Sequence, residues 1–78
     1  MVTLNRIPHY LYQIEEYWFR GTQRRFARDS GVSESTFSRI LHGTTKPHYA
    51  DICLIVDHIE RKLNIKLDPR EVYRIDPS

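Results

Sequence analysis

Residues 23–41, QRRFARDSGVSESTFSRIL, constrain the fold more than any other part of this chain. They predict two short amphipathic helices joined by a tight turn at Gly31, because glycine adopts the left-handed backbone of such a turn without steric cost. Ala27 is small enough for the inner corner between the helices. The second helix is expected to pack on the first through Val32, Phe37 and Ile40. Its outer side is then left polar, with short side chains.

Both helices carry local signals for where they begin and end. We expect them at residues 23–30 and 34–41, with Thr22 and Ser33 as N-caps, because a hydroxyl oxygen accepts the free N–H groups of a first turn. Gly43 is expected to close the second of them.

An additional helix is predicted ahead of this pair, from Pro8 to Arg20, with Gly21 ending it. Helical spacing places Leu11, Ile14 and Trp18 on its core face. It carries further aromatic side chains whose spacing fits a core, a rim or a partner surface equally well: Tyr10, Tyr12, Tyr17 and Phe19.

After the pair, a long helix is expected from His48 or Tyr49 to residue 63, with Asn64 just beyond its end. Its apolar stripe consists of Ile52, Ile55, Val56, Ile59 and Leu63. Asp68 then caps a short last turn that begins at Pro69, while residues 71–75 are alternatively a short strand. The whole pattern predicts an all-α fold, a compact bundle of about five helices.

Size and composition limit the class of protein. The 78 residues give room for one small domain, residues 1–78, and 40% hydrophobic residues suffice for a core. A single cysteine excludes an internal disulfide and fits a reducing, cytoplasmic compartment; its apolar neighbours place Cys53 in the core. We expect no signal peptide, and the longest apolar run, residues 52–56, is far below the ~20 residues that cross a bilayer.

The sequence does not favour catalysis. His9, His42, His48 and His58 do not combine with Cys53 or the carboxylates in a metal-ligand spacing. Residues 43–46 lack the leading glycines of a phosphate-binding loop. Asp57 and His58 are expected to be exposed on their helix. We therefore expect no enzymatic activity, no metal and no cofactor.

Positive charge concentrates around the predicted helix pair. Residues 20–48 hold six lysines and arginines against two acidic residues, a net charge of +4, whereas residues 1–19 and 49–78 are each at −1. Such a distribution is typical of a surface that binds phosphates, although many solvated helices carry as much charge.

The spacing of eight residues in and around the pair resembles the helix-turn-helix of the Cro/cI/Xre family of bacterial and phage regulators. These residues are Gln23, Phe26, Ala27, Gly31, Val32, Phe37, Ile40 and Gly43. The resemblance extends from Pro8 to Tyr73 and implies a lambda-repressor-like DNA-binding domain, with the helix-turn-helix at about 22–43. The departures are Ser30, where the family usually has an apolar residue, and the aromatic first helix.

The resemblance implies that the second helix of the pair reads bases in the major groove. Its base-reading candidates are Glu34, Ser35, Ser38 and Arg39. Arg39 would donate to guanine O6 and N7, and Glu34 would accept from cytosine N4. Alternatively, Glu34 only favours the helix dipole, and the other three are solvated surface residues.

Phosphate contacts are expected around the same surface. Gln23 resembles the family's phosphate-clamping glutamine, and its alternative role is helix capping. The further candidates, each alternatively a plain surface residue, are Thr22, Arg24, Thr36, His42, Thr44, Thr45, Lys46 and His48. Arg25 and Arg28 are expected to point partly toward the first helix.

A reading surface this small covers few base pairs, so we expect a homodimer on half-sites about 34–36 Å apart, or a multiple of that distance. The candidate interface lies in segment 64–76 and consists of Leu67, Val72, Tyr73 and Ile75. Alternatively, these residues close the monomer's own core.

The expected function is that of a small sequence-specific transcriptional regulator, most simply a repressor of the phage, plasmid or mobile-element type. It would act in the cytoplasm at the nucleoid, by occupancy or by contact with RNA polymerase. Two alternatives are an antitoxin-like module that binds a toxin-like protein as well as DNA, and an architectural factor in recombination.

Overall fold

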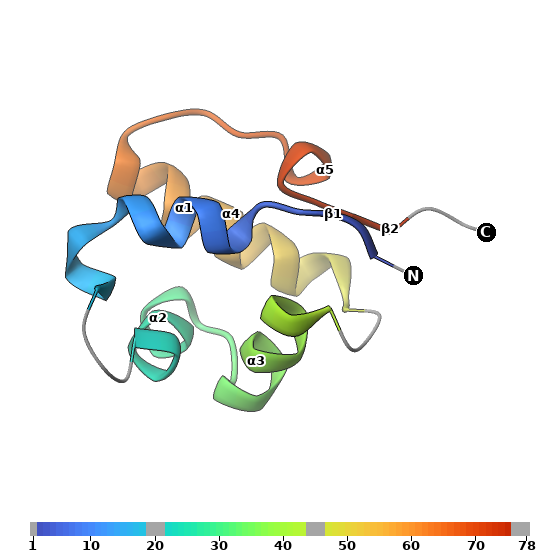
Figure 1. Cartoon of the computed structure of the whole chain (residues 1–78), viewed down its shortest axis with the longest axis horizontal. Coiled ribbons are helices and arrows are strands. Elements are labelled where there is room, and N and C mark those ends of the chain that lie inside the picture. The colour runs from blue at the N-terminus through green and yellow to red at the C-terminus, as the bar shows by residue number, and fades with distance from the viewer. Residues whose placement is uncertain (1, 19–21, 44–46, 76–78) are drawn as a thin grey trace.

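The computed structural model describes residues 2–18, 22–43 and 47–75, with the side chains of residues 2, 3 and 75 left out of the description. Within these ranges it contains five α-helices, one 3-10 helix (η1) and two strands. Their order is β1 (Val2–Asn5), α1 (Ile7–Gln13), η1 (Glu15–Tyr17), α2 (Thr22–Ser30), α3 (Glu34–His42), α4 (Tyr49–Leu63), α5 (Pro69–Val72) and β2 (Tyr73–Ile75). Helices α2 and α3 lie together on one side of the molecule, and the two strands lie at one end (Figure 1). The predicted all-α bundle of about five helices is confirmed.

The first predicted helix is wrong in its length. Helix α1 ends at Gln13, and Ile14 is extended, with φ −99° and ψ 104°, before the single turn of η1. Ile14 and Tyr17 are both in the core, each 4% exposed. Trp18, expected in the core, is instead 59% exposed. The predicted ends at Arg20 and Gly21, and Phe19, lie outside the described residues.

The turn between α2 and α3 has the expected caps. Gly31 has φ +86°, and Gly43 closes α3 with φ +68°, so both glycines adopt a backbone that other residues rarely take. Ser33 Oγ accepts the N–H of Thr36 at 3.3 Å as the N-cap of α3. Ser30 is buried, and its hydroxyl donates to the Ala27 carbonyl at 3.1 Å, so a polar residue fits there.

The centre of the core is a cluster of rings from four elements. Phe26 of α2 stacks on Phe37 of α3 with ring centroids 4.9 Å apart and an interplanar angle of 27°. Edge-to-face contacts join the Phe26 ring to Tyr17 of η1 and to His58 of α4, each with centroids 5.1 Å apart. Both phenylalanines are fully buried, so this stack seals α2 and α3 against each other and onto the rest of the molecule.

A hydrogen-bonded chain crosses the same cluster. The Tyr17 hydroxyl donates to Asp29 Oδ2 at 2.8 Å and lies 2.7 Å from His58 Nε2. Because the hydroxyl has a single proton, Tyr17 must accept from His58, whose Nε2 therefore carries a hydrogen. His58, expected on the surface, is only 7% exposed, and burial, helped by the charge of Lys62, lowers its pKa. The expectation for His58 was wrong because its partner Tyr17 lies in a distant part of the sequence.

Helix α4 follows the prediction closely. It runs from Tyr49 to Leu63 and ends at Asn64, whose φ of 55° is the left-handed C-cap expected there. The stripe is buried except for half-buried Leu63, and Cys53, expected in the core, is also only half-buried. Among the described helices, none combines the length and apolar character needed to cross a membrane.

The C-terminal segment contains both of the alternatives that the sequence left open. Asp68 caps α5 by accepting the N–H of Arg70 at 2.9 Å, and the chain then becomes strand β2 at Tyr73. Strand β2 pairs antiparallel with β1, with Asn5 opposite Tyr73. The sequence did not predict β1 because a single short edge strand has little pattern of its own.

Two buried tyrosines allow a comparison of the contribution that each hydroxyl group makes to the stability of the fold. The buried Tyr73 hydroxyl has no hydrogen-bond partner among the described residues, whereas the Tyr17 hydroxyl has two. Tyr73→Phe is expected to leave the free energy of unfolding unchanged or raise it by up to ~1 kcal/mol, while Tyr17→Phe lowers it by ~1–3 kcal/mol. Urea denaturation measures both. Equal losses in the two variants would contradict this assignment.

The buried imidazole predicts a pH dependence of stability. Since the pKa of His58 is lowered in the folded state, the unfolded chain binds the proton first as pH falls below about 6.5. The contribution of His58 is therefore fully present above that pH and is lost toward pH 5. Urea unfolding at pH 7.5 and 5.0 measures the loss, which His58→Phe should remove. An NMR titration giving His58 a pKa above 6.5 would contradict it.

Candidate nucleic-acid interface

The two sides of α3 differ sharply in character. Phe37 and Ile40 are fully buried, with the Phe37 ring stacked on Phe26 of α2, and on the other side Glu34, Ser35 and Arg39 are exposed. Ser38, the fourth base-reading candidate, is half-buried. The helix therefore presents three of the four predicted residues on one accessible side.

Hydrogen bonds hold several of the polar residues around α3 in place. The Ser33 hydroxyl donates to Thr36 Oγ1 at 2.7 Å, which fixes the half-buried Thr36 in the first turn. His42 Nδ1 lies 2.8 Å from the Ser38 carbonyl and so donates to it, which leaves Nε2 facing outward from the last turn. Thr36 and His42 thus lie at opposite ends of the exposed side of α3.

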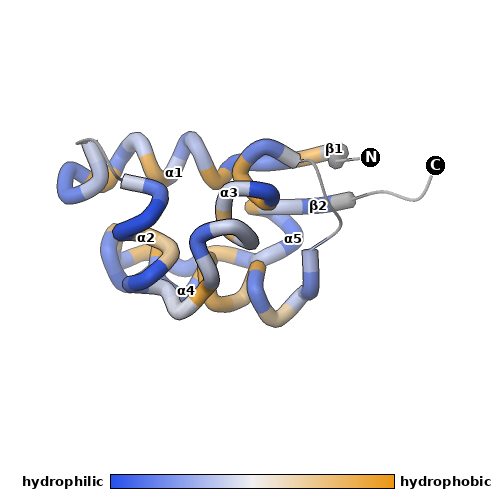
Figure 2. The backbone as a smooth tube through the Cα atoms, turned by 90° about the horizontal axis from the view of Figure 1, so that it is seen from below, coloured by the Kyte–Doolittle hydropathy of each residue, from blue (hydrophilic) through white to orange (hydrophobic). Residues whose placement is uncertain are grey.

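The start of α2 lies beside the start of α3. The first turn of α2 contains Arg24 and Arg25 and no acidic residue, and Figure 2 shows a hydrophilic stretch there. Arg24 Nε donates to Glu34 Oε2 at 3.1 Å, so the first turns of the two helices are joined by an ion pair. The sequence placed both residues in the interface but did not predict that they pair.

Arg25 and Arg28 behave differently from Arg24. The guanidinium of Arg25 is 4.0 Å from the carboxylate of Glu16 in η1, which also binds Lys62 of α4 at 2.8 Å. The hydrogen bond from Lys62 lowers the pKa of Glu16. Arg25 thus faces η1, as expected, and Arg28 is exposed.

Only some of the other predicted phosphate-binding residues are among the described residues. Gln23 is half-buried in the first turn of α2, and the Thr22 hydroxyl donates to the Tyr17 carbonyl. His48 is exposed at the N-cap of α4. Thr44, Thr45 and Lys46 lie outside the described residues.

The predicted dimer surface is largely inside the monomer. Val72 is fully buried and Tyr73 is 6% exposed, both in the monomer's own core, while Leu67 packs partly against it. The side chain of Ile75 lies outside the description. Of the two readings left open by the sequence, closing the monomer core is the one that holds for Val72 and Tyr73.

Asn5 is a residue of this region that sequence reasoning missed. Its Nδ2 donates to the carbonyls of Ile40 and Leu41 at 3.2 and 3.1 Å, and its Oδ1 accepts the N–H of Ile7 at 3.2 Å. One side chain thus ties the C-terminal turn of α3 to β1 and to the start of α1. No local signal could have shown this, since the contact spans 35 residues of sequence.

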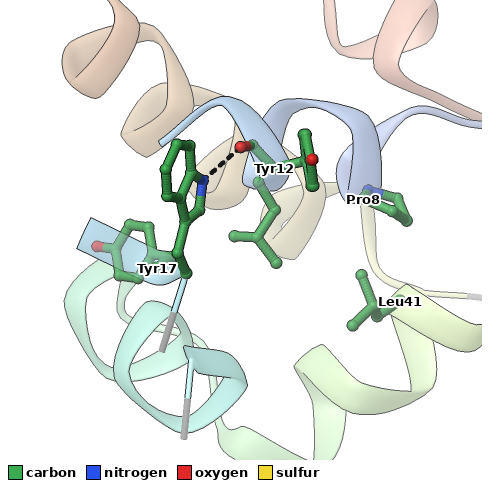
Figure 3. A pocket seen from close by; sticks show the side chains of 6 residues that line it. Pro8, Tyr12, Tyr17 and Leu41 are labelled. Atoms are coloured by element: carbon green, nitrogen blue, oxygen red, sulfur yellow. Dashed lines mark hydrogen bonds between the residues drawn. The ribbon is translucent and has the colours of Figure 1, made fainter. Parts of the chain in front are cut away.

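An apolar groove lies between α1 and α3, next to the last turn of α3. It has a volume of about 500 Å³ and is lined by Pro8, Leu11, Tyr12, Tyr17, Trp18 and Leu41. Two of its lining residues are joined by a hydrogen bond, which the Trp18 indole N–H donates to the Tyr12 carbonyl (Figure 3). Tyr12 is 78% and Trp18 59% exposed, so these two aromatic side chains of the groove are accessible to solvent.

The Asn5 contacts predict that α3 depends on the N-terminal strand. Asn5→Ala should lower the free energy of unfolding by about 1–2 kcal/mol and speed amide hydrogen exchange in the last turn of α3. Asn5→Asp keeps the shape but has no N–H to donate, so its effect should be at least as large. Wild-type stability and exchange in Asn5→Asp would mean that these bonds do not hold α3.

No protein-family model, no curated protein and no solved structure matches the chain.

Proposed function

We propose that this chain is a sequence-specific double-stranded DNA-binding regulator of the Cro/cI/Xre type, with α2 and α3 as its helix-turn-helix. The observation that carries the proposal is α3 itself, a nine-residue helix with a sealed apolar side and an exposed polar side. A helix held in this way can enter the major groove with its outer side chains directed at base edges.

The residues on that side have the chemistry for base reading. The Arg39 guanidinium matches guanine O6 and N7, and the Glu34 carboxylate matches the amino group of cytosine. Ser35 is small enough to allow close approach, and the half-buried Ser38 would contact bases or the sugar-phosphate backbone. These roles rest on residue type, exposure and position along α3.

The phosphate contacts would come from the elements that flank α3. The first turn of α2 has two arginines and no acidic residue, and the helix dipole adds partial positive charge there, which together favour a phosphate near Gln23 and Arg24. His42 in the last turn of α3 and His48 at the N-cap of α4 are both exposed and are further candidates. With a net charge of +4 on residues 20–48, affinity should fall steeply as salt rises, because binding releases counterions from the DNA.

One protomer spans 36 × 26 × 19 Å, so it would cover a single half-site. We propose that two copies bind adjacent half-sites, about 34–36 Å apart. Since Val72 and Tyr73 serve the monomer core, the contact between copies would use other surfaces. Repression by occupying a promoter is the simplest mode of action for a protein of this size.

A second candidate function is binding of a partner protein, as in an antitoxin-like module. The groove between α1 and α3 favours it, because Tyr12 and Trp18 expose apolar surface that the monomer does not cover. Trp18→Ser separates the two functions. It should leave DNA affinity unchanged if the groove serves a protein, and weaken it if the groove is part of the DNA surface.

Binding-site selection from random duplex DNA at a stated salt concentration tests the main proposal. It should enrich a short symmetric or repeated site. Arg39→Ala should then weaken binding to that site by ~1–3 kcal/mol and relax the preference at one base position. Arg61→Ala, which removes an exposed arginine on α4, is the matched control and should do neither.

Both the site selection and the Arg39→Ala variant have an outcome that would contradict the proposal. A pool in which no sequence is enriched would overturn the proposal of sequence-specific binding. An Arg39→Ala profile identical to wild type would show that α3 is placed in the wrong register on the DNA.

A further inference from the structure

The ion pair between Arg24 and Glu34 contributes little to the stability of the fold. Its side chains are 77% and 55% exposed, and pairs of that kind contribute little to stability. The helix dipole favours Glu34 in the first turn of α3 but disfavours a positive charge in the first turn of α2. Arg24 thus occupies a position where the free protein gains little from it.

The same pair would assist DNA binding if α3 enters the major groove. Duplex DNA carries one negative charge per ~1.7 Å of its axis, so a bare carboxylate at its surface is repelled. Glu34 would therefore oppose binding at any site unless a positive charge accompanied it. Arg24 is at hydrogen-bond distance from this carboxylate in the protein alone, before any DNA is present.

We propose that Arg24 is the positioning residue that makes Glu34 usable for base reading; the inference rests on the proposed function. The Arg24 Nε–H holds Oε2 of Glu34, which leaves Oε1 to accept from the exocyclic amino group of a base. The two terminal amino groups of the guanidinium then reach a neighbouring phosphate. Arg24 links one phosphate to one base through Glu34.

This arrangement predicts the sign of the coupling between the two residues. Removing Arg24 in the presence of Glu34 loses a phosphate contact and also leaves an uncompensated carboxylate facing DNA. When residue 34 is neutral, the same removal loses the phosphate contact alone. The coupling would have the opposite sign if Glu34 merely held Arg24 away from a phosphate. In that case Glu34→Gln would free Arg24 to bind the phosphate, and Arg24→Ala would weaken binding more in the Glu34→Gln background.

A double-mutant cycle measures the coupling. The variants are Arg24→Ala, Glu34→Gln and the double variant, and the probes are the duplex enriched by binding-site selection and its single base-pair substitutions. Arg28→Ala, an exposed arginine one turn further along α2, is the matched control for loss of one positive charge. All exchanged side chains are exposed, and circular dichroism confirms that each variant is folded.

Arg24→Ala should weaken binding about tenfold more in the wild-type background than in the Glu34→Gln background, equivalent to ~1.4 kcal/mol of coupling. It should also flatten the preference at the base position that Glu34→Gln affects. Arg28→Ala should show no coupling to Glu34→Gln.

Equal losses in both backgrounds, or coupling of the opposite sign, would overturn the role of Arg24 while leaving the DNA-binding function in place. So would an unchanged preference at the Glu34 position in Arg24→Ala. A wild-type protein that enriches no duplex would overturn both the inference and the proposed function.

Discussion

The stacked rings of Phe26 and Phe37 hold α2 and α3 as one unit. Both rings are fully buried, and the turn between their helices needs a left-handed residue, which Gly31 supplies at φ +86°. Because the inner side of α3 packs in the core in this way, the opposite side must face solvent. Its exposed residues are all polar. The placement of Glu34, Ser35 and Arg39 on one accessible surface therefore depends on a contact that none of them makes.

Long-range hydrogen bonds fix the position of this unit relative to the rest of the chain. Tyr17 joins η1 to α2 through Asp29 and to α4 through His58. Asn5 joins β1 to the last turn of α3 through two carbonyls. Helix α3 is therefore held along its inner side and at its C-terminal end. A helix fixed in this manner loses little conformational freedom on binding, which favours specific over loose association.

The parts of the fold that depend on short-range patterns were predictable from the sequence. Gly31, Ser33, Gly43 and Asn64 act locally, and each ends or caps the helix expected of it. The burial of His58 was missed because it depends on a contact between residues far apart in the chain. Its partner is Tyr17, and Trp18, which follows the break of the first helix at Ile14, is exposed. Likewise, the sequence identified Arg24 and Glu34 separately, but only the crossing of α2 and α3 brings their side chains together.

The central claim is that the outer side of α3, and not the groove beside it, meets DNA. The most direct measurement is an NMR titration of the isotopically labelled protein with a duplex at low and then at high salt. The account predicts that amide shifts concentrate in the first turn of α2 and along α3, at Glu34, Ser35 and Arg39, and that they diminish as salt is raised. Shifts centred on Tyr12 and Trp18, or none at low salt, would contradict it.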